Sequence, residues 1–381
     1  MPKPNRRRLL QYLATLGAAS ATPLYSAAAK APASALEMRI SRYEIIPTRM
    51  PWDERVRGMA VLNWRRENMD VPYSDTTIVK LYTDEGLVGI GDSGSEDALR
   101  RMVGRSPWEY VNSETADVLA VILDLLGKAT ALPACRLLAP NPKKHIFQAY
   151  WSLSYPPDMI AREAKRAAGL GYLIHKVKIR PWEDPVEQAH AIFSAVPSNY
   201  RVWGDTNHTW GSVGRTLYYA PKLAEIPGYF GLESPLRSLE GYRELKGKTP
   251  LRLAEHWGLL SPMLVAREAL LDAWIIPGAN RGETGGGSRG DTVFEQNAFA
   301  TMYDIPLWDE TSCWNGIGLA MQAHQAAAYP GIQLTINAAV TAEDDLAKEP
   351  FTMKDGLYDV PQRPGLGVTL DEDAVDKYRI R

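Results

Sequence analysis

Short apolar segments alternate with longer amphipathic segments along most of the chain. Four of the short segments end in charged or amide side chains, and they read HKVKI, VWGDTN, GLESP and LRLAEHW. Residues i and i+2 of a β-strand lie on one face, so these patterns pair Lys176 with Lys178 and Asp205 with Asn207. The pattern therefore predicts four strands that present polar groups at their carboxyl ends.

The spacing of these strand ends predicts repeated β/α units. Steps of 22 to 28 residues separate Lys178, Asp205, Glu233 and Glu255, which is enough for a strand, a helix and two loops. Successive parallel strands of a (β/α)₈ barrel deliver such residues to one mouth. Carboxylates gathered there repel one another unless a cation lies between them, and an all-oxygen ligand set suits a hard ion such as Mg²⁺.

In order and spacing, these motifs resemble the mandelate racemase and muconate lactonizing enzyme group of the enolase superfamily, from about Met38 to the C-terminus. The segment VILDLLGKATALPACRLLAP is similar to the hinge between the two domains of that family. The resemblance implies an α/β fold with an enolase-type, TIM-like (β/α) barrel in residues 146–350. It also implies an α+β capping domain in residues 36–145, to which the segment 351–381 returns.

The local patterns of the capping region agree with that division. MRISRYEIIPTRM alternates like a strand, and TTIVKLYTDEGLVGIGDSG predicts a hairpin that turns at Asp84–Gly86. A helical apolar stripe that includes Val118 and Ile122 is expected to end at Gly127. HIFQAYWSLSY is then expected to be the first strand of the barrel.

The resemblance implies abstraction of the proton next to a substrate carboxylate, through an enediolate intermediate. By match to the family motif, Lys178 is the expected base and Lys176 the donor to the substrate carboxylate. A lysine has a pKa near 10.4, so Lys178 needs a lowered pKa, which Lys176 and the metal are expected to supply. The expected metal is one Mg²⁺ per subunit, with Mn²⁺ as an alternative. Its expected ligands are Asp205, Glu233 and Glu255, with Asn207 beside them to orient a ligand and bind substrate.

The chain departs from the family on the opposite face of the site. Gly278 stands where an acid or a lysine is expected, and Glu310 stands near the position of the usual histidine. The usual second base is therefore absent, unless Glu310 or Asp309 has taken a new role. An elimination needs only one base, which favours dehydration of a hydroxy or sugar acid; racemisation, epimerisation and cycloisomerisation remain alternatives within the family.

Further candidates for the site lie in its surroundings. The long polar connection WDERVRGMAVLNWRREN suggests that Trp52, Arg55 and Arg57 bind an anionic substrate, although ordinary surface charge would give the same pattern. His208 follows the DxN motif and is a candidate acid for the leaving group, or a residue that packs behind the site. Trp308 is a candidate for the pocket wall or for the core.

Residues 1–35 are predicted to be an export signal. Three arginines at 6–8 precede an apolar run and small residues, as in a twin-arginine signal peptide, so a periplasmic location is expected. A disordered basic tail is the alternative. The absence of cysteine from this segment argues against a lipid anchor.

Charge and cysteine content limit the expected partners. The net charge of −2 becomes −7 when residues 1–35 are removed, which argues against binding to nucleic acid or anionic membranes. A small carboxylate is the expected ligand, and the resemblance suggests a homo-oligomer. Cys135 and Cys313 are expected to be separate buried thiols rather than a disulfide.

Two other classes of function remain open from the sequence. One is a catalytically idle protein that binds metal and an acid sugar. The other is a barrel glycosidase that uses two carboxylates without a metal, although that alternative leaves the two lysines of HKVKI unexplained.

Overall fold

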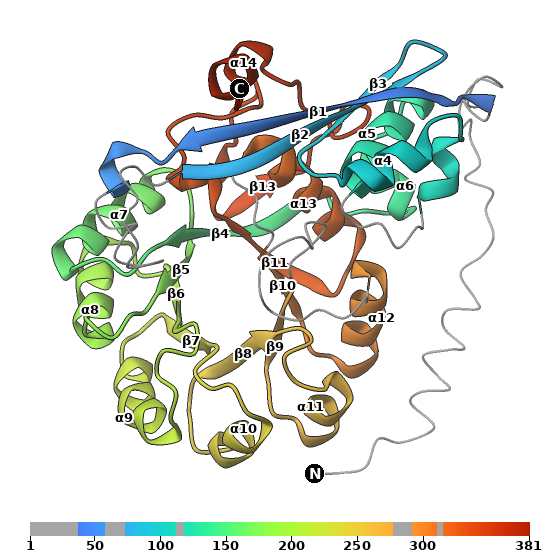
Figure 1. The fold of residues 1–381 in the computed structure, drawn as a ribbon. Helices are drawn as coiled ribbons and strands as arrows, with labels where there is room; N and C mark the ends of the chain where they lie inside the picture. The colour runs from blue at the N-terminus through green and yellow to red at the C-terminus, as the bar shows by residue number, and fades with distance from the viewer. Residues whose placement is uncertain (1–36, 58–72, 112–117, 277–291, 311–314) are drawn as a thin grey trace.

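The computed structural model describes residues 37–57, 73–111, 118–276, 292–310 and 315–381. A ring of strands surrounded by helices forms the larger part, and a three-stranded sheet crosses beside it (Figure 1). No helix within these ranges is both long and apolar enough to cross a membrane. The predicted export signal lies outside them.

The ring is a closed parallel barrel. Its strands are β4 (His145–Ser152), β5 (Ile174–Lys178), β6 (Arg201–Asp205), β7 (Tyr229–Glu233), β8 (Arg252–His256), β9 (Ala273–Ile276), β10 (Leu307–Asp309) and β11 (Ile332–Asn337). They pair in chain order, and β11 pairs with β4 to close the ring. The predicted α/β barrel is thereby confirmed, and the carboxyl ends of all its strands meet at one mouth.

Helices follow the strands and surround the barrel (Figure 1). They are α7 (Pro157–Gly169), α8 (Pro185–Ala195), α9 (Val213–Ala224), α10 (Leu239–Leu245), α11 (Pro262–Glu268), α12 (Val293–Tyr303) and α13 (Gly316–Ala328). Polar caps fix where several begin; for example, Asp184 accepts backbone hydrogen bonds from Val186 and Glu187 at the start of α8. Helix α13 is buried along its whole length because it packs between β11 and the capping domain.

The capping domain is built on an antiparallel sheet of β1 (Ile40–Pro51), β2 (Tyr73–Thr83) and β3 (Val88–Gly91). The hairpin between β2 and β3 turns where the sequence predicted, with Gly86 at φ +79° and its N–H bonded to the Thr83 carbonyl. The helical elements are α4 (Glu96–Met102), the 3₁₀ helix η1 (Pro107–Tyr110), α5 (Leu119–Thr130) and α6 (Ala134–Leu138).

The apolar stripe was expected to end at Gly127, but helix α5 continues past that residue and still buries Ala129, so that prediction was wrong. Gly127 is a packing position: a Cβ on it would lie 2.6 Å from the backbone of Gly365 in the C-terminal segment. The helix ends at Thr130, and Ala131 takes the left-handed conformation that closes it. Gly127 therefore allows the C-terminal segment to approach the helix closely and does not end the helix.

The C-terminal segment contacts both parts of the molecule. It contains β12 (Met353–Lys354), β13 (Leu357–Asp359) and α14 (Glu372–Tyr378). Strand β13 pairs with β4 of the barrel, while α14 packs on β1. The buried carboxylate of Asp124 in α5 accepts backbone hydrogen bonds from Ile90 and Leu366, which ties this segment to the capping domain. Cys135 is a buried free thiol, as expected, and Cys313 lies outside the described ranges.

Candidate active site

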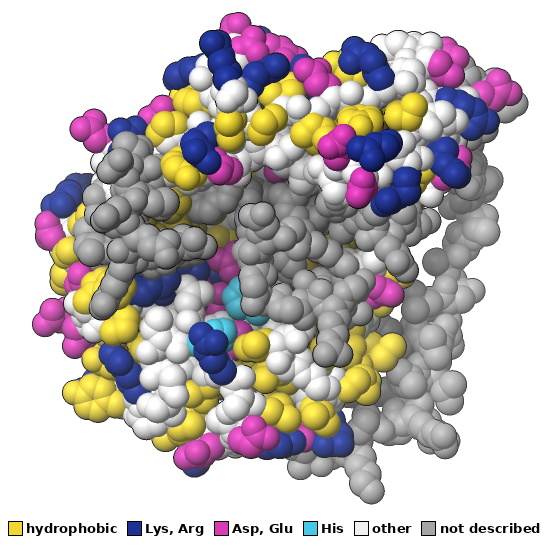
Figure 2. Space-filling model, viewed as in Figure 1, with side chains coloured by type: hydrophobic (Ala, Val, Ile, Leu, Met, Phe, Trp, Pro, Cys, Tyr) yellow, Lys and Arg dark blue, Asp and Glu magenta, His cyan; other side chains and the backbone are white. Residues whose placement is uncertain are grey.

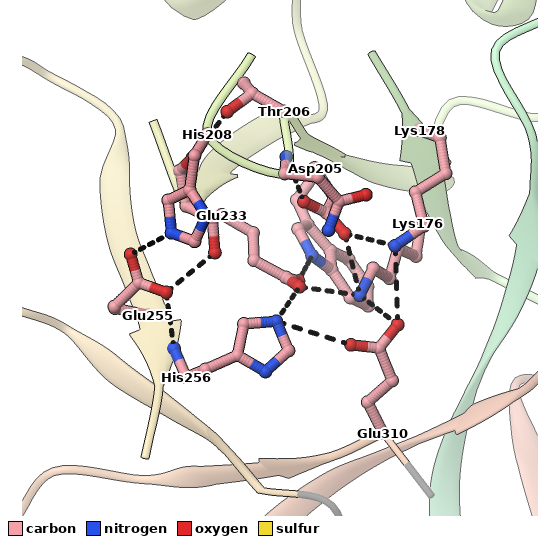
Figure 3. A network of polar contacts seen from close by, with 12 residues as sticks. Lys176, Lys178, Asp205, Thr206, His208, Glu233, Glu255, His256 and Glu310 are labelled. Atoms are coloured by element: carbon pink, nitrogen blue, oxygen red, sulfur yellow. Dashed lines mark hydrogen bonds and ion pairs between the residues drawn. The ribbon is translucent and has the colours of Figure 1, made fainter. Parts of the chain in front are cut away.

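Two lysines project from β5 into the mouth of the barrel, where acidic side chains meet them (Figure 3). The Nζ atom of Lys176 lies 2.7 Å from Glu233 Oε1, 2.5 Å from Glu310 Oε1 and 3.2 Å from Asp205 Oδ2. Lys178 bonds Asp205 Oδ2 and lies 3.6 Å from Glu310 Oε1. Period-two alternation places both amines on one face, as the sequence predicted.

Burial makes the charges of this cluster interdependent. Burial alone would lower the pKa of Lys176, but Glu233 and the neighbouring carboxylates raise it well above its ordinary value. Burial opposes ionisation of Asp205, yet Lys178 and Lys176 hold its pKa well below its usual range. The pKa of Glu233 is raised, first by burial and then by repulsion from Asp205. Lys176 is therefore a fixed cation, and Glu233 is the carboxylate that most needs further positive charge.

Strained backbone follows the ends of β6 and β7. Asn207 and His208 have φ values of 43° and 62°, and Ser234 has a φ of 50°. Cross-strand bonds hold these turns: the Ser234 carbonyl accepts hydrogen bonds from the His208 N–H at 2.8 Å and the Thr206 hydroxyl at 2.5 Å. Left-handed conformations of residues other than glycine persist only where surrounding contacts impose them, and they gather at functional sites. Here they direct the His208 ring toward β8.

Glu255, at the end of β8, is fully buried and accepts four hydrogen bonds. Its Oε1 accepts from the Ser234 hydroxyl at 2.8 Å and the His256 N–H at 2.7 Å. Its Oε2 accepts from the Tyr242 hydroxyl at 2.7 Å, and His208 Nε2 lies 3.1 Å away. The structure therefore brings Asp205 and Glu233 together, whereas a separate set of hydrogen-bond donors surrounds Glu255.

Glu310 reaches the mouth from β10. Alternate residues face opposite sides of a strand, so Glu310 shares the interior side with Trp308 and Asp309 does not. Burial would raise the pKa of Glu310, but Lys176 and its neighbours lower it. His256 Nε2 lies 3.8 Å from Glu310 Oε2 and 3.4 Å from Glu233 Oε1. Burial disfavours the His256 cation, yet these carboxylates raise its pKa to about 9.

The capping domain reaches the site through an aromatic contact. Trp52 is buried, donates from its indole N–H to the Ser74 hydroxyl at 2.8 Å, and packs edge-on against Trp151 of β4. The Lys178 amine lies 5.8 Å from the centre of the Trp151 ring. Trp52 therefore packs against the ring of Trp151, which lies beside the amine of the predicted base Lys178.

Arg55 and Arg57 fasten the same segment to the barrel. Arg55 forms an ion pair with the buried Glu163 of α7 and donates to the Val340 carbonyl at 3.0 Å. Arg57 pairs with Glu343 at 2.6 Å. Both guanidinium groups therefore have carboxylate partners within the protein, and their role in substrate binding stays a prediction.

Two further predicted residues lie beside the cluster, together with one that the sequence reasoning missed. Asn207 donates its N–H to Asp205 Oδ1 at 2.8 Å and accepts from Arg180 Nη2 at 2.8 Å. Arg180 is buried two residues beyond Lys178, so continued alternation was the signal that could have identified it. The Trp308 ring packs at a tilt against Trp203 inside the barrel, and the Trp203 indole donates to Glu233 Oε2 at 3.0 Å.

The donor set fits a divalent cation. The ligand atoms of Glu233, His256 and Glu310 all lie within 4.8 Å of one another. The Lys176 amine that contacts Glu233 and Glu310 also contacts Asp205. Buried carboxylates that repel one another gain most from a cation. Histidine and charged side chains also gather at the centre of the face in Figure 2. Gly278 and the connection beyond Arg57 lie outside the described residues.

Comparison with known proteins identifies the family to which this chain belongs. Residues 159–374 match the family described as enolase C-terminal domain-like. Muconate cycloisomerase 1 of Rhodococcus opacus is 26% identical over 271 residues, covering 68% of this chain and 70% of that protein. Arabinonate dehydratase of Saccharolobus solfataricus is 25% identical over 276 residues, with the same coverage of 68% and 70%.

A solved structure gives the same fold. N-succinyl Arg/Lys racemase from Bacillus cereus superposes with a TM-score of 0.71 at 16% identity, and the match covers 90% of this chain and 98% of that one. The two sequence relatives are an isomerase and a lyase, which supports an enzyme of one of these two classes.

Proposed function

Because this chain belongs to the enolase C-terminal domain-like family, in the mandelate racemase and muconate lactonizing enzyme group of the enolase superfamily, we propose that it dehydrates a hydroxy or sugar acid. The observation that carries the proposal is the buried pair of lysines on β5 beside converging carboxylates. An amine beside a fixed cation suits removal of a proton from a carbon next to a carboxylate.

The two lysines have different tasks in this proposal. Lys176 stays protonated, because its carboxylate neighbours raise its pKa, and it donates to the substrate carboxylate. The neutral amine of Lys178 takes the α proton as the C–H bond breaks, and the electron pair moves into the carboxylate to form an enediolate. The β C–O bond then breaks, and the hydroxyl group leaves as water with the proton that Lys178 has gained. One base on one face therefore serves both halves of the elimination.

The negative charge of the enediolate must be stabilised as it forms. Members of this superfamily typically use Mg²⁺, and a divalent ion held by Asp205 and Glu233 would, when bound, supply positive charge to the substrate oxygens. The chain's own contribution is to hold those carboxylates: Trp203 donates to Glu233, and the Asn207 N–H donates to Asp205. These bonds fix the carboxylates before a substrate arrives.

A second candidate is an isomerase of the same family, either a racemase, an epimerase or a cycloisomerase. The observation in its favour is Glu310, which reaches the mouth from β10 and contacts Lys176. A racemase needs a second proton donor, and a carboxyl group on another strand offers one. In the dehydratase reaction Glu310 is not needed as an acid.

The test is solvent exchange combined with product analysis. The purified chain is incubated with a panel of hydroxy and sugar acids in D₂O with Mg²⁺, beside Lys178→Ala and the surface control Lys165→Ala. We expect deuterium at the α carbon or a dehydrated product with the wild type and with Lys165→Ala. Removing a general base lowers rates about 10²- to 10⁴-fold, so Lys178→Ala should lose both signals. Inverted substrate without loss of water would favour the isomerase. Ligand binding without exchange would indicate an idle binding protein.

A further inference from the structure

We propose that Arg180 is a positioning residue of this site: its guanidinium holds Asn207, and Asn207 in turn orients the Asp205 carboxylate. The inference rests on the proposed function, because it concerns how the chain keeps Asp205 in place for a divalent ion. The motifs of the sequence point to Asp205 and Asn207, and they assign no task to Arg180.

Arg180 joins the end of β5 to the turn that follows β6. Only 5% of the residue is exposed, and a buried charge is costly unless it is hydrogen-bonded. Its Nη1 donates to the Ile179 carbonyl at 3.1 Å, and its Nη2 donates to Asn207 Oδ1 at 2.8 Å. The backbone N–H of Arg180 donates to the Ser154 hydroxyl at 3.3 Å. One planar group therefore bridges two neighbouring strand ends.

The turn that Arg180 contacts has a strained backbone. Asn207 and His208 are both left-handed, with φ values of 43° and 62°. Residues other than glycine keep this conformation only where neighbouring contacts impose it. The His208 N–H donates to the Ser234 carbonyl at 2.8 Å, so the segment after β7 fixes one side of the turn. The bond from Arg180 to the Asn207 side chain fixes the other side, from β5.

This turn orients the Asp205 carboxylate. The Asn207 N–H donates to Asp205 Oδ1 at 2.8 Å, whereas Asp205 Oδ2 contacts the amines of both lysines. Figure 3 shows the Asp205 carboxylate between the turn after β6 and these two amines. The carboxylate is therefore held on both oxygens, and the bond from Asn207 is the one that depends on the shape of the turn.

The charge of Arg180 and its hydrogen bonds predict opposite effects on ion binding. Burial opposes ionisation of Asp205, and its pKa is lowered first by the two lysines and then by the Arg180 cation. A cation that acts on Asp205 also repels a divalent ion at that carboxylate, so loss of the charge alone would tighten ion binding. Loss of the bond to Asn207 would weaken ion binding, because the carboxylate is no longer held in place. The sign of the change therefore separates the two roles.

The first experiment measures the Mg²⁺ affinity of the full chain by calorimetry, without substrate. The variants are Arg180→Met, Asn207→Gly and the double variant, with the exposed Arg162→Met as matched control. Glycine takes a left-handed φ without strain and keeps the backbone N–H, so Asn207→Gly removes only the side chain that Arg180 holds. Arg180→Lys keeps the positive charge but lacks the planar fork that reaches two acceptors.

We expect Arg180→Met and Asn207→Gly each to bind Mg²⁺ about tenfold more weakly than the wild type. The double variant should bind no more weakly than either single variant, because both substitutions remove the same contact. Arg180→Lys should also bind more weakly, whereas Arg162→Met should bind as the wild type does.

The second experiment follows the turn itself by amide hydrogen exchange, measured by NMR on the metal-free chain. In Arg180→Met, the amides of Asn207 and His208 should lose their protection. The Thr206 N–H, which donates to the Glu233 carbonyl at 3.1 Å, is the internal reference and should exchange as in the wild type. A general loss of stability would instead speed the exchange of all three amides.

Three results would overturn the assignment: unchanged or tighter Mg²⁺ binding in Arg180→Met, losses that add in the double variant, or unchanged amide exchange at Asn207. The expected Mg²⁺ results without deuterium exchange at the α carbon of any acid would refute the proposed reaction and keep the role of Arg180. A wild type that binds no Mg²⁺ would also refute the proposed reaction, and amide exchange alone would then decide whether Arg180 holds the turn.

Discussion

Replacing Lys176 with Met would remove the buried cation that three carboxylates share. Its Nζ lies 2.5 to 3.2 Å from oxygens of Glu310, Glu233 and Asp205, and none of the residue is exposed. Breaking a buried ion pair by deleting one partner costs about 3–5 kcal/mol. At about 2.1 cal/mol/K of unfolding entropy per residue, a folded chain of this size has about 0.7–0.8 kcal/mol/K. The melting temperature should therefore fall by about 4–7 °C.

Calorimetric melting in the presence of a chelator measures this loss. The control is Lys165→Met, which removes an exposed lysine from α7 and should melt within about 1 °C of the wild type. A divalent ion that binds the same carboxylates would replace the missing charge, so excess Mn²⁺ should restore part of the lost stability. If Lys176→Met melted with Lys165→Met in chelator, or if the ion stabilised both variants equally, the shared-cation account would be refuted.

Two other predictions test positions outside the lysine cluster. Tyr242→Phe removes the hydroxyl that donates to buried Glu255 at 2.7 Å, so urea unfolding should show a loss of about 1.5–3 kcal/mol, against less than about 0.5 kcal/mol for the exposed Tyr218→Phe. His324 accepts a backbone N–H with one ring nitrogen and bonds a backbone carbonyl with the other, and burial lowers its pKa to about 4. The folded pKa of His324 lies below its unfolded pKa of about 6.5. Its contribution to the free energy of unfolding is therefore complete above that pH and is lost as the pH falls toward 4, at about 1.4 kcal/mol per pH unit. The urea midpoint of His324→Gln should fall less steeply over this window, whereas His190→Gln should follow the wild type; parallel wild-type and His324→Gln curves would contradict the assignment.

Much of the site could be predicted because parallel strands convert sequence spacing into spatial proximity. Lys178, Asp205 and Glu233 each end a strand of one barrel, and Lys176 lies two residues before the end of β5, so the alternation of strand side chains places it on the same face as Lys178. A closed barrel fixes where each strand ends, so residues far apart in the chain come together at one mouth. The resemblance drawn from these same residues led to the family that the comparisons support.

The contacts made by each side chain at that mouth were less predictable. Arg55 looked like a substrate-binding group, yet it pairs with Glu163 across 108 residues of sequence. Glu255 occupies a strand end as predicted, but donors from three neighbouring segments surround it. A short sequence motif does not determine which hydrogen-bond donor a carboxylate pairs with when several donors lie close to it.

The sequence by itself determined the strand ends that carry the lysines and acids, because periodicity and spacing are properties of the chain alone. The barrel with its capping domain followed from the family resemblance that these motifs carry. Only the tertiary structure decided that Glu310 and His256 face Glu233 while Glu255 turns to Tyr242. A charge buried among several others takes the arrangement that pairs the most donors and acceptors. That arrangement depends on distances between strands that no local pattern contains.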